Sequence, residues 1–180
     1  MNTRKITRSD KWFMDALLQL MKMKPYNKIK ITDIAGKADL NCRTFYRHFN
    51  SKDDVLKLYC ESLVAELPDM IFQKGTLTMY SVTVSYFEFC EKNVDFLLLL
   101  KKHGLTYFLL DHYDHLRELV KNQIKPNASA DEYGGRTPYM FAFILGGYWN
   151  IVNQWLLDTP RKSPEEMARI VVEIIFEKNI

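Results

Sequence analysis

The residues best suited to chemistry are basic and aromatic side chains between residues 43 and 47. Arg43, Tyr46 and Arg47 are spaced i, i+3 and i+4, so on a helix they share one face. A guanidinium group can bond to guanine O6 and N7 at the same time. The spacing therefore predicts an exposed helix face, here called the basic-aromatic face, that is suited to contact DNA.

Two short helices are predicted to position this face. Thr32 is expected to cap the first helix, a turn follows at residues 39–41, and Asn41 is expected to cap the second helix. Phe45 and Phe49, four residues apart, give the second helix an apolar stripe away from the basic-aromatic face. Two short helices with one apolar and one basic side predict a helix-turn-helix unit.

The charge of the chain is unevenly distributed, although its formal net charge is only +3. Residues 1–52 hold 12 Lys or Arg against 4 Asp or Glu, a balance of +8. Residues 53–180 hold 13 against 18, a balance of −5. The asymmetry indicates that only the first part contacts a polyanion, and an uneven solvated surface is the alternative.

Composition limits the class of protein. With 180 residues, 47% hydrophobic and 26% charged, the chain is typical of a globular protein. Its longest apolar run, near residues 94–100, is too short to span a bilayer, and no secretory signal follows the basic first residues, so no membrane partner is expected. Three widely spaced cysteines argue against disulfides and a zinc site, and predict a reduced, cytoplasmic protein.

Enzyme motifs are missing from the sequence. No Glu-x-x-His pair, nucleophile elbow or phosphate loop occurs. The segment 111–115 has the helical spacing of a metal site, but an exposed polar helix surface is the favoured interpretation. We therefore expect no enzyme activity, no catalytic residue, no metal and no cofactor.

The remaining pattern is helical throughout and predicts an all-α fold of about nine helices. No strand pattern appears. Residues 1–54 are expected to form a helix-turn-helix DNA-binding domain, and residues 55–180 a helical effector-binding and dimerisation domain. Start and stop signals predict a helix from about Ser9 to Met23, then a helix that begins with a capping box at Ser51 and Asp54 and ends near Leu67, before Pro68. Further along the chain they predict a helix from Leu105 to Lys125 and a loop at 126–137. The last two predicted elements are a long helix from Thr137, with Gly146-Gly147 in its middle, and a final helix capped by Ser163.

The segment from the first helix to the start of the fourth resembles the DNA-binding domain of TetR/AcrR-family transcriptional regulators. The resemblance lies in Ile31–Ala35, Ala38, Thr44–Phe49 and Ser51–Asp54. Lys24-Pro25-Tyr26, and a Gly-to-Trp segment before a Ser-Pro-Glu-Glu helix, resemble a branch that includes dihydroxyacetone-kinase operon regulators. The family usually has Gly where this chain has Asp39, so Asp39 is expected to adopt a positive φ.

The resemblance implies roles for individual residues. Phosphate contacts would come from Tyr46, His48 and Lys52, and often from the position of Thr32. Base contacts would come from Asn41, Cys42, Arg43 and Thr44, and Arg47 completes the DNA-binding set. Two alternatives are a salt bridge from Arg43 to Asp39, and an ordinary exposed role for Lys52.

The resemblance also implies how such a protein works. A homodimer would bind a near-palindromic double-stranded DNA operator, and a small apolar or aromatic effector would bind among the middle helices. The last two helices would form the dimer interface, with Trp149, Trp155, Ile170 and Ile174 as candidates and core packing within one subunit as the alternative. The expected function is a ligand-responsive repressor. The alternative is an activator or adaptor controlled by a protein partner.

Overall fold

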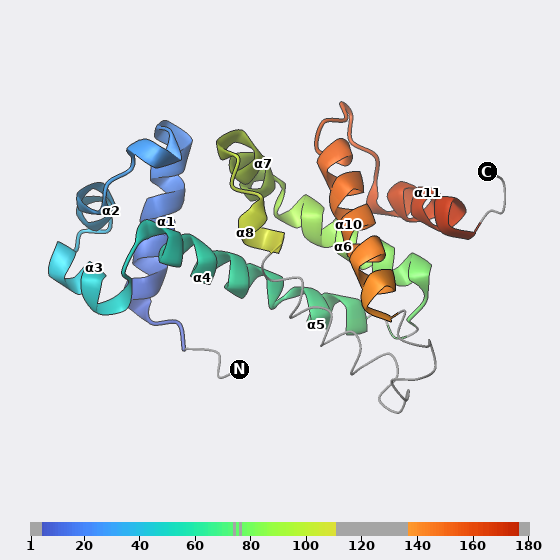
Figure 1. The fold of residues 1–180 in the computed structure, drawn as a ribbon, viewed down its shortest axis with the longest axis horizontal. Coiled ribbons are helices and arrows are strands. Elements are labelled where there is room, and N and C mark those ends of the chain that lie inside the picture. Colours follow the sequence, from blue (N-terminus) through green and yellow to red (C-terminus); the bar gives the residue numbers. More distant parts are fainter. Residues whose placement is uncertain (1–4, 74, 76, 111–136, 177–180) are drawn as a thin grey trace. The chain divides into compact units, whose positions relative to one another are not determined.

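The computed structural model describes residues 5–73, 75, 77–110 and 137–176 (Figure 1). Every regular element in these ranges is a helix, which confirms the all-α fold class. None of the described helices is long and apolar enough to cross a membrane. The metal alternative at 111–115, nearly all of the loop at 126–137 and most of the helix expected to end at Lys125 lie outside the described residues.

The described chain forms two compact units. The first contains the residues up to Leu63 together with Leu99–Leu110. The second contains Val64–Leu98 and the described residues after Leu110. The expected functional boundary after residue 54 stays a prediction.

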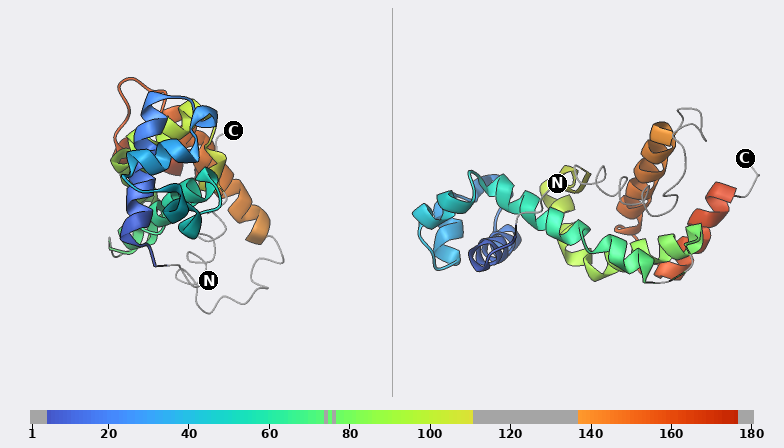
Figure 2. Two further views of the ribbon diagram at one scale, coloured as in Figure 1. Left: turned by 90° about the vertical axis from the view of Figure 1, so that its left-hand side faces the viewer. Right: turned by 90° about the horizontal axis from the view of Figure 1, so that it is seen from below.

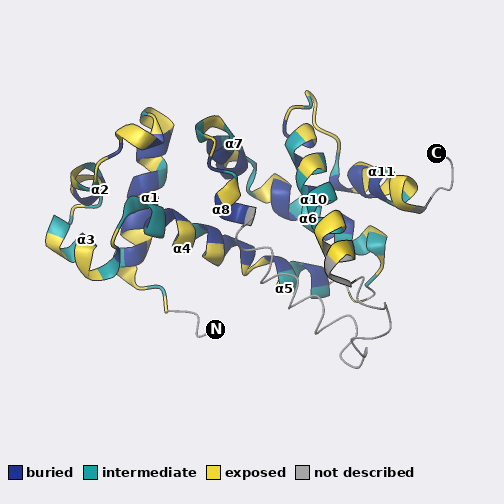
Figure 3. Cartoon of the chain, in the orientation of Figure 1, coloured by how far each residue is buried: buried dark blue, intermediate teal, exposed yellow. Residues whose placement is uncertain are grey.

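Helix α1 (Arg8–Met23) begins the first unit and packs against α2 (Ile31–Lys37). Thr7 caps it, because the Asp10 N–H donates to Thr7 Oγ1 at 3.2 Å while the Thr7 N–H donates to Asp10 Oδ2 at 2.7 Å. One side of α1 is buried and the other is exposed (Figure 3). The buried side carries the apolar residues Phe13, Leu17, Leu20 and Met21.

Helices α2 (Ile31–Lys37) and α3 (Cys42–His48) complete the helix-turn-helix, and α2 contacts both α1 and α3 (Figures 1 and 2). The prediction that Thr32 caps α2 is wrong. Lys30 takes the cap position because its N–H donates to Asp33 Oδ2 at 2.8 Å, which starts the helix before Thr32. Asp39 has φ 54°, so the positive φ expected at the turn is confirmed.

Helices α4 (Lys52–Val64) and α5 (Leu67–Phe72) follow. The capping box at Ser51 is confirmed, since the Asp54 N–H donates to Ser51 Oγ at 3.2 Å and the Ser51 N–H donates to Asp54 Oδ2 at 3.0 Å. The prediction that Pro68 ends this helix is wrong. Pro68 lies in the first turn of α5, where its missing N–H is not needed.

The second unit is organised around α6 (Met79–Lys92), which packs against α5 and against α11 (Pro164–Phe176). Helix α10 (Thr137–Trp155) adds Trp155, whose ring meets that of Phe87 edge-on at 5.6 Å. The Ser163 cap of α11 is confirmed by Glu166, whose N–H donates to Ser163 Oγ at 3.2 Å. Helices α7 (Val94–His103) and α8 (Tyr107–Leu110) lie between α6 and α10 in the chain.

The strained turn residue generates a prediction. Asp39→Gly should raise the free energy of unfolding by about 0.5–1 kcal/mol, because glycine adopts a positive φ without a Cβ clash. Urea denaturation measures the change. Lys37→Gly, in the last turn of α2, is the matched control and should lower stability by about 1 kcal/mol. A loss of stability in both variants would contradict strain at Asp39.

Candidate nucleic-acid interface

An aromatic cluster holds α3 against α1. Phe45 of α3 is fully buried, and its ring meets the Phe13 ring of α1 edge-on at 5.2 Å. Phe49, directly after α3, meets the same Phe13 ring at 6.0 Å and 86°. A seven-residue helix is too short to be stable alone, so these contacts position it.

The opposite side of α3 is exposed, as its spacing predicts. Arg43, Tyr46 and Arg47 all face solvent, and 58% of Tyr46 is exposed. Together with Asn41 and Thr44 they line a shallow surface hollow. Five of the predicted DNA-binding residues are therefore neighbours on one surface.

The start of α3 is formed as predicted. Asn41 caps it by accepting a hydrogen bond of 2.7 Å from the Thr44 N–H. This bond uses one lone pair of the side-chain oxygen, and the two N–H groups of the amide remain as donors. Cys42 is half-buried in the first turn. In the described part of the chain, Arg43 makes no ion pair with Asp39, so the salt-bridge alternative for Arg43 is absent.

The C-terminal end of α3 is fixed to α1 by a buried pair. His48 Nδ1 lies 2.9 Å from Asp10 Oδ1, and the Asp10 side chain is 0% exposed. Thr7 donates two further hydrogen bonds to Asp10 Oδ2, both of 2.7 Å. A buried carboxylate thus connects the start of α1 to the end of the helix that carries the basic-aromatic face.

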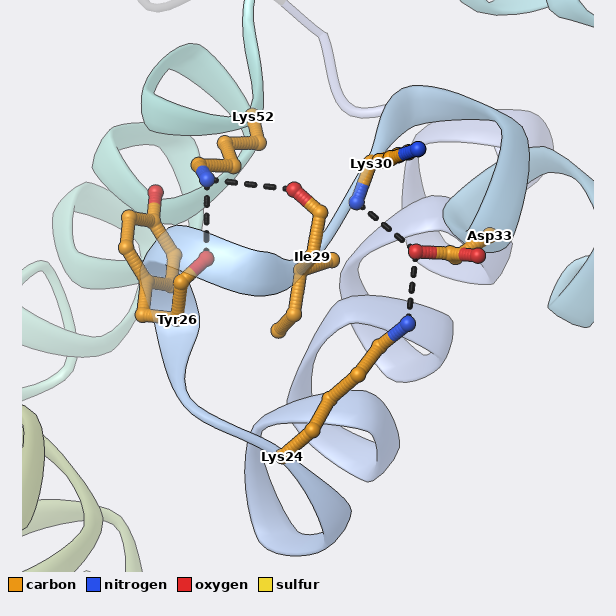
Figure 4. A network of polar contacts seen from close by, with 6 residues as sticks. All are labelled: Lys24, Tyr26, Ile29, Lys30, Asp33 and Lys52. Atoms are coloured by element: carbon orange, nitrogen blue, oxygen red, sulfur yellow. Dashed lines mark hydrogen bonds and ion pairs between the residues drawn. The ribbon is translucent and has the colours of Figure 1, made fainter.

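Lys52 holds the turn between α1 and α2. Its ammonium group donates to the Tyr26 carbonyl at 2.8 Å and to the Ile29 carbonyl at 3.1 Å, and it lies 4.6 Å from the centre of the Tyr26 ring (Figure 4). The same view shows Lys24 reaching Asp33 at 2.6 Å. The hydrogen bond from Lys24 lowers the pKa of the Asp33 carboxyl below its usual range.

Tyr26 links this turn to two further helices. It lies in a short 3₁₀ helix (Tyr26–Lys28), and its hydroxyl donates to Asp53 Oδ1 in α4 at 2.7 Å. Burial, reinforced by this hydrogen bond, raises the pKa of the Tyr26 hydroxyl well above its usual range. The Tyr26 N–H donates to His103 Nδ1 at 3.4 Å, and His103 Nε2 lies 2.8 Å from the Met21 carbonyl of α1.

No local pattern in the sequence predicts this connection. His103 lies 77 residues after Tyr26, and no local spacing relates the two. The alternative of an ordinary exposed lysine at position 52 is wrong, because the Lys52 side chain is half-buried over the turn and bonds two backbone carbonyls there.

The predicted dimer residues lie in different environments. Trp155 is 1% exposed, and its Nε1–H donates to the Lys162 carbonyl at 2.8 Å, so it belongs to the core of its own chain. Trp149 and Ile170 are half-buried, and Ile174 is 62% exposed. Thr32, also predicted to contact DNA, is exposed near the start of α2.

Comparison with known families agrees with this architecture. The family described as bacterial regulatory proteins, tetR family, matches residues 13–58, and the transcriptional regulator C-terminal region of the same family matches residues 78–177. The chain therefore belongs to the TetR family of DNA-binding transcriptional regulators. No curated protein matches it in sequence.

Two solved structures share the fold. One is a TetR transcriptional regulator from Streptococcus agalactiae 2603V, with a TM-score of 0.68, 22% identity and 93% of each chain covered. The other is the fatty acid degradation regulator FadR from Bacillus halodurans, with a TM-score of 0.66, 16% identity, and coverage of 97% of this chain and 98% of that one. At these identities the likeness concerns the fold alone.

The contacts of Lys52 generate a prediction for stability. Lys52→Met should lower the free energy of unfolding by about 1–3 kcal/mol, because two backbone carbonyls each lose the ammonium donor, and of the two only the Tyr26 carbonyl also accepts a backbone N–H from the described residues, that of Ile29 at 3.1 Å. Urea denaturation measures the loss, and Lys57→Met, on an exposed position of α4, should cause little change.

Unchanged stability of Lys52→Met would contradict the role of Lys52 in holding the turn. The phosphate contact predicted for the same residue is tested separately by the salt dependence of DNA binding. Loss of one phosphate contact flattens that dependence by about one unit of slope.

Proposed function

We propose that this TetR-family protein is a ligand-responsive repressor that binds a near-palindromic operator as a dimer. The observation that carries the proposal is the exposed basic-aromatic face of α3, held from behind by the buried aromatic cluster. The positive balance of residues 1–52 favours the same surface as the contact with DNA.

The proposed contacts follow the chemistry of each side chain. Arg43 reads a guanine, with Asn41, Cys42 and Thr44 beside it at the start of α3. The phosphates on either side are bound by the following residues: Thr32, Tyr46, Arg47, His48 and Lys52. Phosphate contacts set the register of the protein on DNA, and base contacts set its sequence preference.

Lys52 is compatible with both of its proposed roles. An ammonium group has three N–H donors, and two of them are used on the Tyr26 and Ile29 carbonyls. The third is the donor that we assign to a phosphate. The turn contacts then keep the ammonium in one place and lower the entropy lost when DNA binds.

The proposed dimer interface uses α10 and α11. Tyr139 and Phe143, four residues apart on α10, are 79% and 80% exposed. Gly146, three residues further along the same face, has open space where a Cβ would lie, and so has Gly147. Exposed aromatic rings beside glycines suit close approach by a second helix, and Ile174 of α11 is a further exposed apolar residue.

A small apolar or aromatic effector is proposed for the second unit. Helices α6 and α10 bring aromatic side chains together there, with the Tyr86 and Tyr148 rings edge-on at 5.2 Å.

The turn at Lys24-Pro25-Tyr26 supports placing the chain near the dihydroxyacetone-kinase operon regulators. That placement, too, is a proposal.

Arg43→Ala tests base reading. The test uses a duplex that the wild-type protein enriches from a random DNA pool. The variant's preference for this duplex over unrelated DNA should fall by about 1–3 kcal/mol, the discrimination lost at the guanine position. Fluorescence anisotropy at fixed salt measures both affinities. Arg169→Ala, an exposed arginine of α11, is the matched control. Unchanged affinity and preference in Arg43→Ala would remove Arg43 from the base-reading set.

Phe143→Asp and Ile174→Asp test the interface. Each places a charge on the proposed apolar contact and should convert dimers to monomers in sedimentation-velocity experiments. Met23→Asp, at an equally exposed apolar position of α1, should leave the dimer intact. Dimers that persist in both interface variants would place the contact elsewhere.

A further inference from the structure

The buried pair at the end of α3 restricts what His48 can do. Asp10 is enclosed, and its Oδ2 already accepts two hydrogen bonds from Thr7. Its position in the first turn of α1 and these donors favour the ionised carboxylate. An ionised carboxylate only accepts hydrogen bonds, so His48 Nδ1 must carry the proton in the 2.9 Å contact.

This assignment decides the state of the other ring nitrogen. A neutral imidazole carries one proton, and here it lies on Nδ1. Nε2 of the neutral ring is then an acceptor, and it cannot donate to a phosphate oxygen, which is also an acceptor. Only the doubly protonated ring can hold Asp10 and a phosphate at the same time.

We propose that His48 contacts a DNA phosphate as an imidazolium held by the buried carboxylate of Asp10, so that operator binding is coupled to proton uptake at His48. This inference rests on the proposed function, since it needs His48 at the DNA backbone. Asp10 acts through His48 and is therefore a positioning residue. It makes DNA affinity depend on pH, with tighter binding at lower pH.

Groups from α1 and α3 surround the His48 ring. From α1 it meets the Asp10 carboxylate and the Phe13 ring, at 6.4 Å between centroids. The Phe49 ring lies 6.3 Å from the His48 ring between centroids, and Arg47 precedes His48 on α3. The Arg47 cation opposes the imidazolium, and a phosphate close by would offset that repulsion.

Isothermal titration calorimetry measures the proton directly. The full-length protein is titrated at pH 7.5 with a duplex enriched from a random DNA pool, in buffers of different ionisation enthalpy and equal ionic strength. Proton uptake above zero, and at most one proton per protomer, is the expected result, because only the doubly protonated ring can contact Asp10 and the phosphate together. As the pH is raised, the dissociation constant should increase by up to tenfold per pH unit for each proton taken up on binding.

Three variants identify the source of the proton. His48→Gln keeps an N–H donor for the phosphate but cannot titrate, so its uptake should vanish. Asp10→Asn offers an amide donor to Nδ1, which lets the neutral ring present Nε2–H, so its uptake should fall. His103→Gln is the matched control because this histidine contacts backbone atoms of Met21 and Tyr26, and its uptake should equal that of the wild type.

The outcomes separate the two proposals. Binding of the enriched duplex without proton uptake, or uptake that persists in His48→Gln, would overturn the role of the pair. Enrichment of no duplex at any pH would overturn the proposed function itself. If Asp10→Asn fails to fold, as circular dichroism would show, the comparison of His48→Gln with His103→Gln still decides.

Discussion

The edge-on packing of Phe13 against Phe45 and Phe49 is the contact on which the DNA-binding unit depends. Helix α3 has seven residues, fewer than an isolated helix needs to persist in water. The orientation of α3 therefore depends on its contacts with α1 as much as on its own sequence. Because the rings are enclosed, any movement of α3 relative to α1 would expose apolar surface. These contacts therefore fix the direction in which the basic-aromatic face points.

A second set of contacts surrounds Tyr26. Its carbonyl and ring meet Lys52, its hydroxyl meets Asp53, and its N–H meets His103, so one residue joins the start of α4 to the end of α7. The turn after α1 contains Pro25, which lacks the N–H that a helix would use, and side chains from distant segments satisfy the carbonyls there. The Lys52 ammonium at this turn therefore hydrogen-bonds to backbone carbonyls as well as adding positive charge.

The sequence predicted the features that depend on neighbours along the chain. Asn41, Ser51 and Ser163 cap helices because each capping side chain bonds an N–H three residues away. The positive φ of Asp39 followed from the residue usual at that turn in the family. Thr32 and Pro68 were assigned wrongly because each position lies beside a second local signal. Asp33 accepts the Lys30 N–H and starts α2 before Thr32, and Pro68 lies in the first turn of α5 instead of ending a helix. The pairs Asp10–His48 and Tyr26–His103 join distant segments, and no periodic pattern encodes them.

The grouping of Leu99–Leu110 with the first 63 residues has a consequence for protein engineering. A DNA-binding domain cut out at a single site after α3 or α4 would lack the segment that carries His103. Its α1 and the turn at Tyr26 would lose their partners from the later part of the chain. Exchanging DNA specificity between this protein and a relative is therefore better done by grafting the surface of α3 alone. A fusion at one junction would transfer α3 without the segment Leu99–Leu110, which belongs to the same compact unit.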